Sequence, residues 1–346
     1  MIPGPCALHP NDLGRLAEQT RAHYGADWSA FYSGFLDEVG ALLDAHSAYL
    51  LPGSGSAGLE AAIRNQFEPG QTVVVPSTGF FGARLAEIAT ALDLRVRVVE
   101  QSLGEPVDVD QLDQHLSGAD GLACVHVEST TGIRHPIQEM AQRARARGLV
   151  VVVDGVASAG SEVVQLRATG IDAFVSASQK GLGGPPGLAV VAFDDLGAER
   201  AARARPRSWY FDLGRWARSR AEDIWEPHPV TMPTAVVRAL AESVGRITAT
   251  GIESWVDSRR RLAAQLRGGL SGLGFETFAP ENAAANMITV VAGSGARELV
   301  ARAARGGIMV AGGLEPLSSA ARIGLVGATA TSEHVTALLD TLSAGR

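Results

Sequence analysis

The chain has a single lysine, Lys180, in 346 residues, and every other basic side chain is arginine. Cysteine is nearly as scarce, since Cys6 and Cys124 lie far apart and offer neither a disulfide framework nor metal-ligand spacing. No uncharged apolar run approaches the ~18 residues of a membrane-spanning helix, and the first residues lack a signal-peptide pattern. These absences predict a cytoplasmic protein with no membrane contact and no metal site.

The charge balance argues against nucleic acid as a partner. The net charge is −7, whereas a nucleic-acid-binding surface needs a basic patch. With 46% hydrophobic and 19% charged residues, the chain can bury a large core. Its length suits about two domains of roughly 150 residues each.

Short apolar runs alternate with helical patterns in the first part of the chain. Strands that alternate with helices of about ten residues form βαβ units, and runs that are apolar throughout are typical of strands covered on both faces. The pattern therefore predicts an α/β fold with a seven-stranded, mainly parallel sheet. The expected strands are 48–51, 72–75, 96–99, 121–126, 149–153, 173–176 and 188–193.

The pattern changes after Pro233. Apolar residues recur at helical spacing over 236–247 and 252–270, which predicts two helices. Shorter runs typical of strands follow, and a final helix is expected at 332–342 with Thr331 or Ser332 as its N-cap. We expect three parts. They are an N-terminal arm at 1–15, a large domain at 16–240 and a smaller C-terminal α/β domain at 241–346.

Two strands of the expected sheet end in chemically useful residues. Lys180 follows the strand 173–176 after a short turn, and Asp154 closes the all-valine run 150–153. Parallel strands deliver both to one edge of the sheet. Pyridoxal 5′-phosphate (PLP) needs an amine for its Schiff base and an anion to keep its ring nitrogen protonated. The alternatives are a solvated loop lysine and an aspartate that caps the following segment.

The segment Gly53–Gly58 satisfies G-x-G-x-x-G between a strand and a helix. A dinucleotide site would also need an acidic residue at the end of the next strand, but 75–78 contains none. Free N–H groups at a helix N-terminus still favour an anion, so we place a phosphate at Ser54, Gly55 and Ser56. The alternative is a tight turn without a ligand.

Six segments stand out in order along the chain. They are Pro3-Gly4-Pro5, Gly53-Ser54-Gly55 with Leu59-Glu60-Ala61-Ala62, Glu128-Ser129-Thr130-Thr131-Gly132, Asp154-Gly155-Val156-Ala157-Ser158, 171–189 around Lys180, and Gly312-Gly313-Leu314 with Arg322-Ile323-Gly324-Leu325. Together they resemble one family, the class V PLP-dependent aminotransferases, and within it they are similar to the alanine– or serine–glyoxylate aminotransferase branch. This resemblance implies a PLP-transferase of fold type I that forms a homodimer with active sites at the interface.

The resemblance also implies roles around the cofactor ring. Lys180 would form the Schiff base and shuttle a proton, and Asp154 would pair with the ring nitrogen. Val156 would press one face of the ring and Phe81 would stack on the other, with core packing as the alternative for Phe81. Ser129 would hydrogen-bond near the ring and the substrate carboxylate.

Further implied contacts concern the phosphate and the substrate. Gln179 would help to hold the phosphate, and from the neighbouring subunit Thr231 would reach it, with His228 where the family has a tyrosine. Arg322 would bind the substrate α-carboxylate in a bidentate way, unless it serves a structural ion pair. Gly4 would lie near the same carboxylate through its backbone.

The predicted reaction is transamination between a small L-amino acid, alanine or serine, and a 2-oxo acid such as glyoxylate or pyruvate. One alternative is a transaminase for another amine, 2-aminoethylphosphonate or pyridoxamine with pyruvate. A PLP-dependent lyase is a further alternative, and a cysteine desulfurase is disfavoured because no cysteine follows Cys124. The alternative from a different functional class is a non-catalytic protein of the PLP fold that acts as a binding or regulatory subunit.

Overall fold

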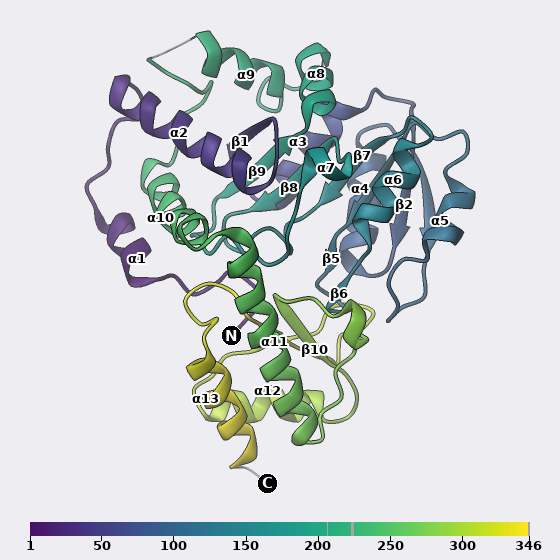
Figure 1. Cartoon of the computed structure of the whole chain (residues 1–346), viewed down its shortest axis with the longest axis vertical. Helices are drawn as coiled ribbons and strands as arrows, with labels where there is room; N and C mark the ends of the chain where they lie inside the picture. Colours follow the sequence, from purple (N-terminus) through teal and green to yellow (C-terminus); the bar gives the residue numbers. More distant parts are fainter. Residues whose placement is uncertain (206, 223–224, 345–346) are drawn as a thin grey trace.

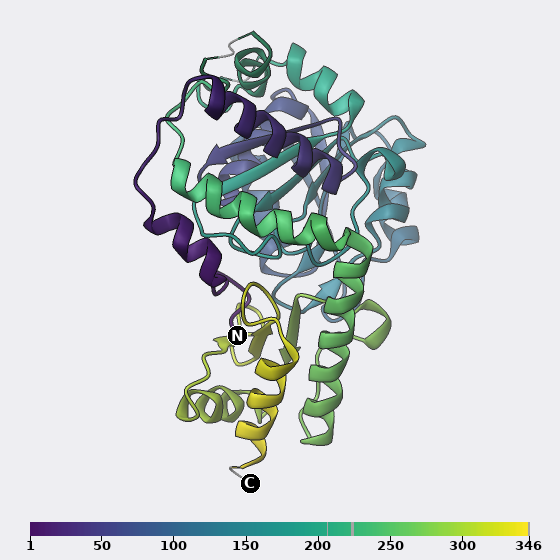
Figure 2. The ribbon, with the colours of Figure 1, turned by 60° about the vertical axis from the view of Figure 1, so that its left-hand side comes forward.

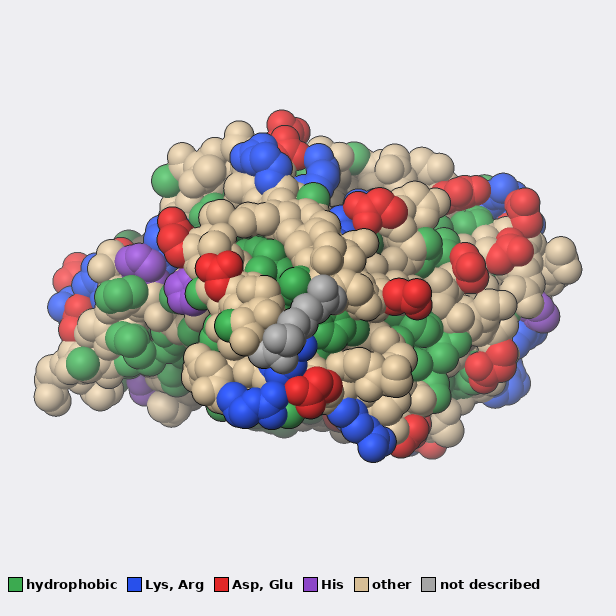
Figure 3. Space-filling model, turned by 90° about the horizontal axis from the view of Figure 1, so that it is seen from below, with side chains coloured by type: hydrophobic (Ala, Val, Ile, Leu, Met, Phe, Trp, Pro, Cys, Tyr) green, Lys and Arg blue, Asp and Glu red, His purple; other side chains and the backbone are tan. Residues whose placement is uncertain are grey.

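A computed structural model describes residues 1–205, 207–222 and 225–344. Figure 1 shows a large body built on one sheet, with a smaller unit below it that carries the C-terminus. No helix among the described residues is long and apolar enough to cross a membrane. Seen from the end that carries the smaller unit, basic and acidic side chains are interspersed and do not gather into one basic surface (Figure 3).

The large sheet has seven strands in the order β1-β9-β8-β7-β4-β2-β3. Every strand is parallel to the others except β9, which is antiparallel to both of its neighbours. The predicted fold class and all seven predicted strands are confirmed. The strands are β1 (Ser47–Pro52), β2 (Thr72–Ser77), β3 (Arg95–Glu100), β4 (Gly121–Val125), β7 (Val150–Asp154), β8 (Ala173–Ala177) and β9 (Leu188–Phe193).

Helices cover both faces of this sheet. All residues of β4, β7, β8 and β9 are buried, as their apolar composition predicts. Figure 2 shows α2 and α10 lying across one face. The helices of the large body are α2 (Ala26–Leu42), α3 (Gly55–Gln66), α4 (Phe80–Ala91), α5 (Val109–His115), α6 (Ile137–Arg145), α7 (Leu166–Thr169), α8 (Asp195–Arg203), α9 (Leu213–Glu222) and α10 (Thr234–Thr250).

The smaller unit has its own antiparallel sheet, in the order β10-β12-β11, and its own hydrophobic core. The last helix begins as predicted, because the Thr331 hydroxyl accepts a hydrogen bond from the N–H of His334 at 3.3 Å. Its elements are α11 (Ile252–Gly272), a 3₁₀ turn (Glu281–Ala283), β10 (Ile288–Val291), α12 (Ala296–Arg305), β11 (Ala311–Gly312), β12 (Ala321–Gly324) and α13 (Ser332–Ser343).

The division into domains remains a proposal. Buried residues of α10 as far as Ile247 pack in the core of the large body, so we propose a boundary near Gly251 in place of 240. The last two residues of the expected small domain, 345–346, lie outside the described residues.

The N-terminal arm runs between the two parts before α1 (Pro10–Ala17) begins. The Met1 carbonyl accepts a hydrogen bond from Gly324 at 2.9 Å, and the N–H of Cys6 donates to the Gln179 carbonyl at 3.1 Å. Ala7 forms a parallel bridge with Gly327. The arm therefore contacts the segment that carries Lys180 and the small sheet at the same time.

Candidate active site

Lys180 and Asp154 lie at the carboxyl edge of the large sheet, as predicted. Asp154 is the last residue of β7 and pairs in register with Val175 of the neighbouring β8, whereas Lys180 follows the end of β8 after two intervening residues. The Lys180 Nζ donates a hydrogen bond to the carbonyl of Pro3 in the arm at 2.8 Å. The arm therefore holds the amine at the sheet edge.

Burial shifts the pKa values of the two groups toward each other. Asp154 is 5% exposed, and burial raises the pKa of its carboxyl to about 6, against the N–H of Val156 that donates to Oδ1 at 2.9 Å. Burial and, after it, the positive charge of Arg322 lower the pKa of Lys180 to about 8, and Asp154 opposes this shift. Lys180 therefore lies within electrostatic reach of both Asp154 and Arg322.

This amine can be titrated by itself, because it is the only ε-amine of the chain. In protein labelled with ¹³C-lysine and free of cofactor, we expect a single Cε resonance whose midpoint lies at about pH 8. Arg322→Met should raise the midpoint, since it removes a positive charge, and Asp154→Asn should lower it. The unfolded chain is the control and should titrate near 10.5. A folded midpoint near that value would contradict the placement of Lys180.

Gly4 packs directly against Lys180. A Cβ at Gly4 would lie 2.7 Å from the lysine Cδ and 2.9 Å from Cε and Nζ, and the φ of Gly4 is +123°. Only glycine fits here without strain. The predicted proximity of Gly4 to a bound substrate carboxylate stays a proposal, but its contact with the lysine that would bind the cofactor is a geometric fact.

Replacing Gly4 should therefore displace the amine. We expect Gly4→Ala to lower stability by about 1–3 kcal/mol, the usual cost of backbone strain, and to slow cofactor attachment. Gly14→Ala in α1 is the matched control, because a Cβ there would meet no described atom within 4 Å, and it should leave both properties intact. Thermal unfolding and the rate of cofactor uptake measure the two effects, and equal behaviour of the two variants would contradict the packing argument.

The start of α3 offers an anion site beside Asp154. Its N-cap residue, Ser54, makes no side-chain capping bond, and within the described chain no hydrogen-bond partner occupies the N–H groups of Gly55 and Ser56. A Cβ at Gly55 would lie 2.7 Å from Val156 Cγ2, so the helix start packs tightly against Val156. Backbone donors at a helix start are suited to a phosphate.

Gln179 lies between β8 and Lys180 and has contacts with Ser178 and with the arm. Its side-chain oxygen accepts a hydrogen bond from the Ser178 hydroxyl at 3.4 Å, while its carbonyl is bound by the arm. The amide nitrogen has no described partner among the residues that the structure covers. Gln179 can therefore donate to a phosphate, as proposed from the sequence.

Glu128 is a site residue that sequence reasoning missed. Its buried carboxylate accepts hydrogen bonds from the N–H groups of Phe81 and Gly82 at 3.1 Å and of Thr130 at 3.0 Å. A Cβ at Gly79 would lie 2.8 Å from its Cδ. The sequence offered a signal for it, because a carboxylate that follows the run 121–127, which is apolar except for His126, needs buried donors. Glu128 thereby fixes the start of α4, where Phe81 lies.

The remaining residues of the site differ in their surroundings. Phe81 is partly buried, with the Arg84 guanidinium 5.5 Å from its ring centroid, and Ser129 is 3% exposed beside Glu128. On β12, the Nε of Arg322 donates to the Gly312 carbonyl at 2.8 Å. Burial lowers the pKa of this guanidinium and Glu128 opposes the shift. The structure therefore brings Arg322 to the same site from the small unit.

The two residues expected to reach a partner subunit lie in different settings. Thr231 is exposed, whereas His228 is 1% exposed and accepts a hydrogen bond from Trp28 Nε1 at 2.9 Å. The His228 ring also packs against Tyr32, with ring centroids 5.1 Å apart. A contact of His228 with a partner's phosphate would require this loop to rearrange. Thr231 needs no such change.

These residues fit PLP. A buried carboxylate stands where a ring nitrogen could meet it, free backbone donors stand where a phosphate could lie, and one amine of lowered pKa lies between the arm and the sheet edge. The donor set contains no cluster of metal-ligating side chains among the described residues.

Comparisons with known proteins agree with this geometry. The family model Aminotransferase class-V matches residues 18–338, and the chain belongs to this family. It is 30% identical to an uncharacterized aminotransferase of Methanocaldococcus jannaschii, over 84% of this chain and 76% of that protein. It is also 30% identical to the alanine–glyoxylate aminotransferase of Mus musculus, over 85% of this chain and 73% of that protein.

A solved structure extends the similarity over the whole fold. The crystal structure of alanine–glyoxylate aminotransferase from Nostoc sp. superposes with a TM-score of 0.93 at 26% identity, covering 99% of this chain and 93% of that one. The predicted resemblance is confirmed, and the protein is a PLP-dependent aminotransferase.

Proposed function

We propose that the protein transfers the amino group of a small L-amino acid, alanine or serine, to a 2-oxo acid such as glyoxylate or pyruvate. The observation that carries this proposal is the position of Lys180 at the carboxyl edge of the sheet, within electrostatic reach of both Asp154 and Arg322. An amine, a carboxylate for a ring nitrogen and a guanidinium for a substrate carboxylate are what this reaction needs.

Several residues would hold the cofactor. Asp154 would meet the ring nitrogen, the N–H groups of Gly55 and Ser56 would bind the phosphate, and Val156 and Phe81 would lie on the two ring faces. Side chains that would add hydrogen bonds to the phosphate or near the ring are Ser54, Ser56, Gln179 and Ser129. When bound, PLP supplies an aldehyde to which an amine attaches and a ring that takes up electron density.

The chain's own side chains would do the rest of the work. Arg322 would hold the α-carboxylate of the substrate and thereby orient its α-hydrogen. Lys180 Nζ, released from the cofactor, would take the proton from the α-carbon and return it on the cofactor side. With a pKa of about 8, this amine is neutral in a useful fraction of molecules near neutral pH. Glu128 would keep α4, and hence Phe81, in place.

We also propose a homodimer in which Thr231 of each subunit reaches the partner's phosphate, with His228 able to join only after its loop rearranges. A cytoplasmic location is proposed on the two cysteines, which are free and buried.

A screen of half-reactions tests the donor. The PLP-loaded protein is mixed with L-alanine, L-serine, 2-aminoethylphosphonate and pyridoxamine in turn, and the visible absorption of the lysine-bound cofactor is followed. Loss of this absorption with alanine or serine, with release of the matching oxo acid, is the expected result. If only 2-aminoethylphosphonate or only pyridoxamine gives a response, that amine replaces alanine and serine as the proposed amino donor. No response to any amine would favour a non-catalytic role.

A further inference from the structure

A second cavity lies between the two parts of the molecule, behind the loop that follows Lys180. Its volume is about 180 Å³. Its walls come from six segments. They are His9 at the end of the arm, Gly160 and Ser161 after β7, Gly181 and Gly183 after Lys180, the helices α10 and α11, and the loop 325–331 after β12. Lys180 and Arg322 do not line it, so it is distinct from the candidate active site.

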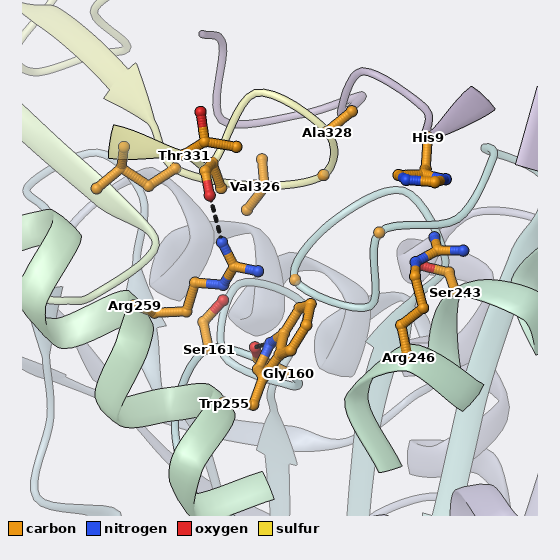
Figure 4. A pocket seen from close by; sticks show the side chains of 15 residues that line it. His9, Gly160, Ser161, Ser243, Arg246, Trp255, Arg259, Val326, Ala328 and Thr331 are labelled. Carbon is orange, nitrogen blue, oxygen red and sulfur yellow. Dashed lines mark hydrogen bonds between the residues drawn. The ribbon is translucent and has the colours of Figure 1, made fainter. Parts of the chain in front are cut away.

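The lining carries positive charge and lacks an acid. Arg246, Arg259 and His9 line the cavity, and no aspartate or glutamate is found among the described lining residues. Figure 4 shows Arg259 and Trp255 on one side and Arg246 and His9 on the other, facing the same space.

Only one of the two arginines is neutralised. Arg246 donates to both carboxylate oxygens of the fully buried Asp12, at 2.9 and 2.7 Å. Arg259 forms no ion pair with any carboxylate in the described part of the chain, where its guanidinium has a single hydrogen bond, to the Ala330 carbonyl at 2.6 Å. A partly buried cation without a paired anion is energetically unfavourable, so the Arg259 guanidinium favours the binding of an anion.

The position of Arg259 is fixed by its surroundings. Its Cζ lies 4.2 Å from the centroid of the Trp255 ring, and Trp255 Nε1 is bound to the Gly160 carbonyl at 2.9 Å. Ser161 lines the same cavity, and Figure 4 shows it on the side that carries Arg259 and Trp255. A hydroxyl and a planar guanidinium that line one cavity can together bind the two oxygens of a carboxylate.

The rest of the cavity is suited to an apolar body. Val326 and Ala328 line the side opposite α11 (Figure 4), and Ala330 also lines the cavity. An engineered cavity of ~150 Å³ takes up benzene, so this cavity is large enough for one aromatic ring or a branched aliphatic group of similar size. Inorganic phosphate is more strongly hydrated and would find too few donors here.

We propose that this cavity is a binding site for a small monocarboxylate with one aromatic ring or a branched apolar group, held by Arg259 and Ser161. The site is independent of the proposed function, since none of its residues is assigned to the cofactor or the substrate.

Direct binding of benzoate to the PLP-loaded protein tests the site, with calorimetry as the readout. We expect saturable binding that Arg259→Met weakens by about tenfold to a hundredfold, the usual effect of losing a charged hydrogen bond. Arg260→Met is the matched control, since the adjacent Arg260 pairs with Asp257 on the surface, and it should leave binding unchanged. Benzyl alcohol, which has the ring without the charge, and phosphate should bind weakly or not at all.

Two further variants distinguish binding in this cavity from binding at the active site and from a loss of folding. Arg322→Met removes the proposed carboxylate anchor of the active site, and benzoate should still bind to it. Ser161→Ala should weaken binding severalfold with the melting temperature of the free protein unchanged, which keeps the test valid if Arg259→Met does not fold. The proposal is overturned by equal binding to the wild type and Arg259→Met, by loss of binding in Arg322→Met, or by no saturable binding at about 10 mM benzoate.

Discussion

Lys180→Ala should abolish covalent attachment of the cofactor and reduce transamination by at least about a thousandfold. The reason is that Lys180 is the only ε-amine in the chain, so no neighbouring lysine can substitute for it. Borohydride reduction followed by mass spectrometry of the intact protein checks the first effect, and oxo-acid release checks the second.

Lys180→Arg is the matched control for charge. It retains a cation beside Asp154 but cannot form a Schiff base, so it should show the same loss of adduct and activity. A mass adduct on either variant would mean that another amine holds the cofactor. Activity that survives in both variants would contradict the proposed proton transfer at this position.

Arg322→Met should weaken the binding of alanine and serine by about tenfold to a hundredfold, because it removes a bidentate charged partner of the α-carboxylate. Pyridoxamine has no carboxylate, so any response to it should be unaffected. The half-reaction rate as a function of donor concentration measures the change.

Arg297→Met on α12 is the control for this prediction, since Arg297 is exposed on the same small unit. It should behave as the wild type. Arg322→Lys should recover little, because an ammonium cannot match a carboxylate with two parallel hydrogen bonds. An equal loss with pyridoxamine would show that Arg322 acts on the fold or the cofactor instead of the substrate.

The large sheet was predictable because its strands carry their own signal. Runs such as 150–153 are apolar throughout and are separated by helices of regular spacing, and each became a strand within a residue or two. Helix α2 was not predicted, although its buried residues Trp28, Tyr32, Phe35 and Val39 recur at helical spacing. The short strands β5 (Val127–Glu128) and β6 (Ile133–Arg134) were also missed, since two residues carry no periodicity.

The active site was predictable only in part, for a physical reason. Lys180 and Asp154 stand at strand ends, where the topology alone brings them together. The contact of Lys180 with the Pro3 carbonyl joins residues 177 positions apart. Local sequence patterns do not predict such a contact, because they carry no information on the path of the N-terminal arm. Burial of His228 likewise depends on packing with Trp28 and Tyr32 of a distant helix.

The solitary lysine gives the chain one scissile bond for a lysine-specific protease, the bond from Lys180 to Gly181. That bond lies behind the arm, in a turn where a Cβ at Gly181 would come within 2.2 Å of the Ala159 carbonyl oxygen. Nicking at this point requires local opening. The rate at which two fragments appear on a gel would therefore report how often the segment around Lys180 opens. This measurement needs no label and no engineered probe.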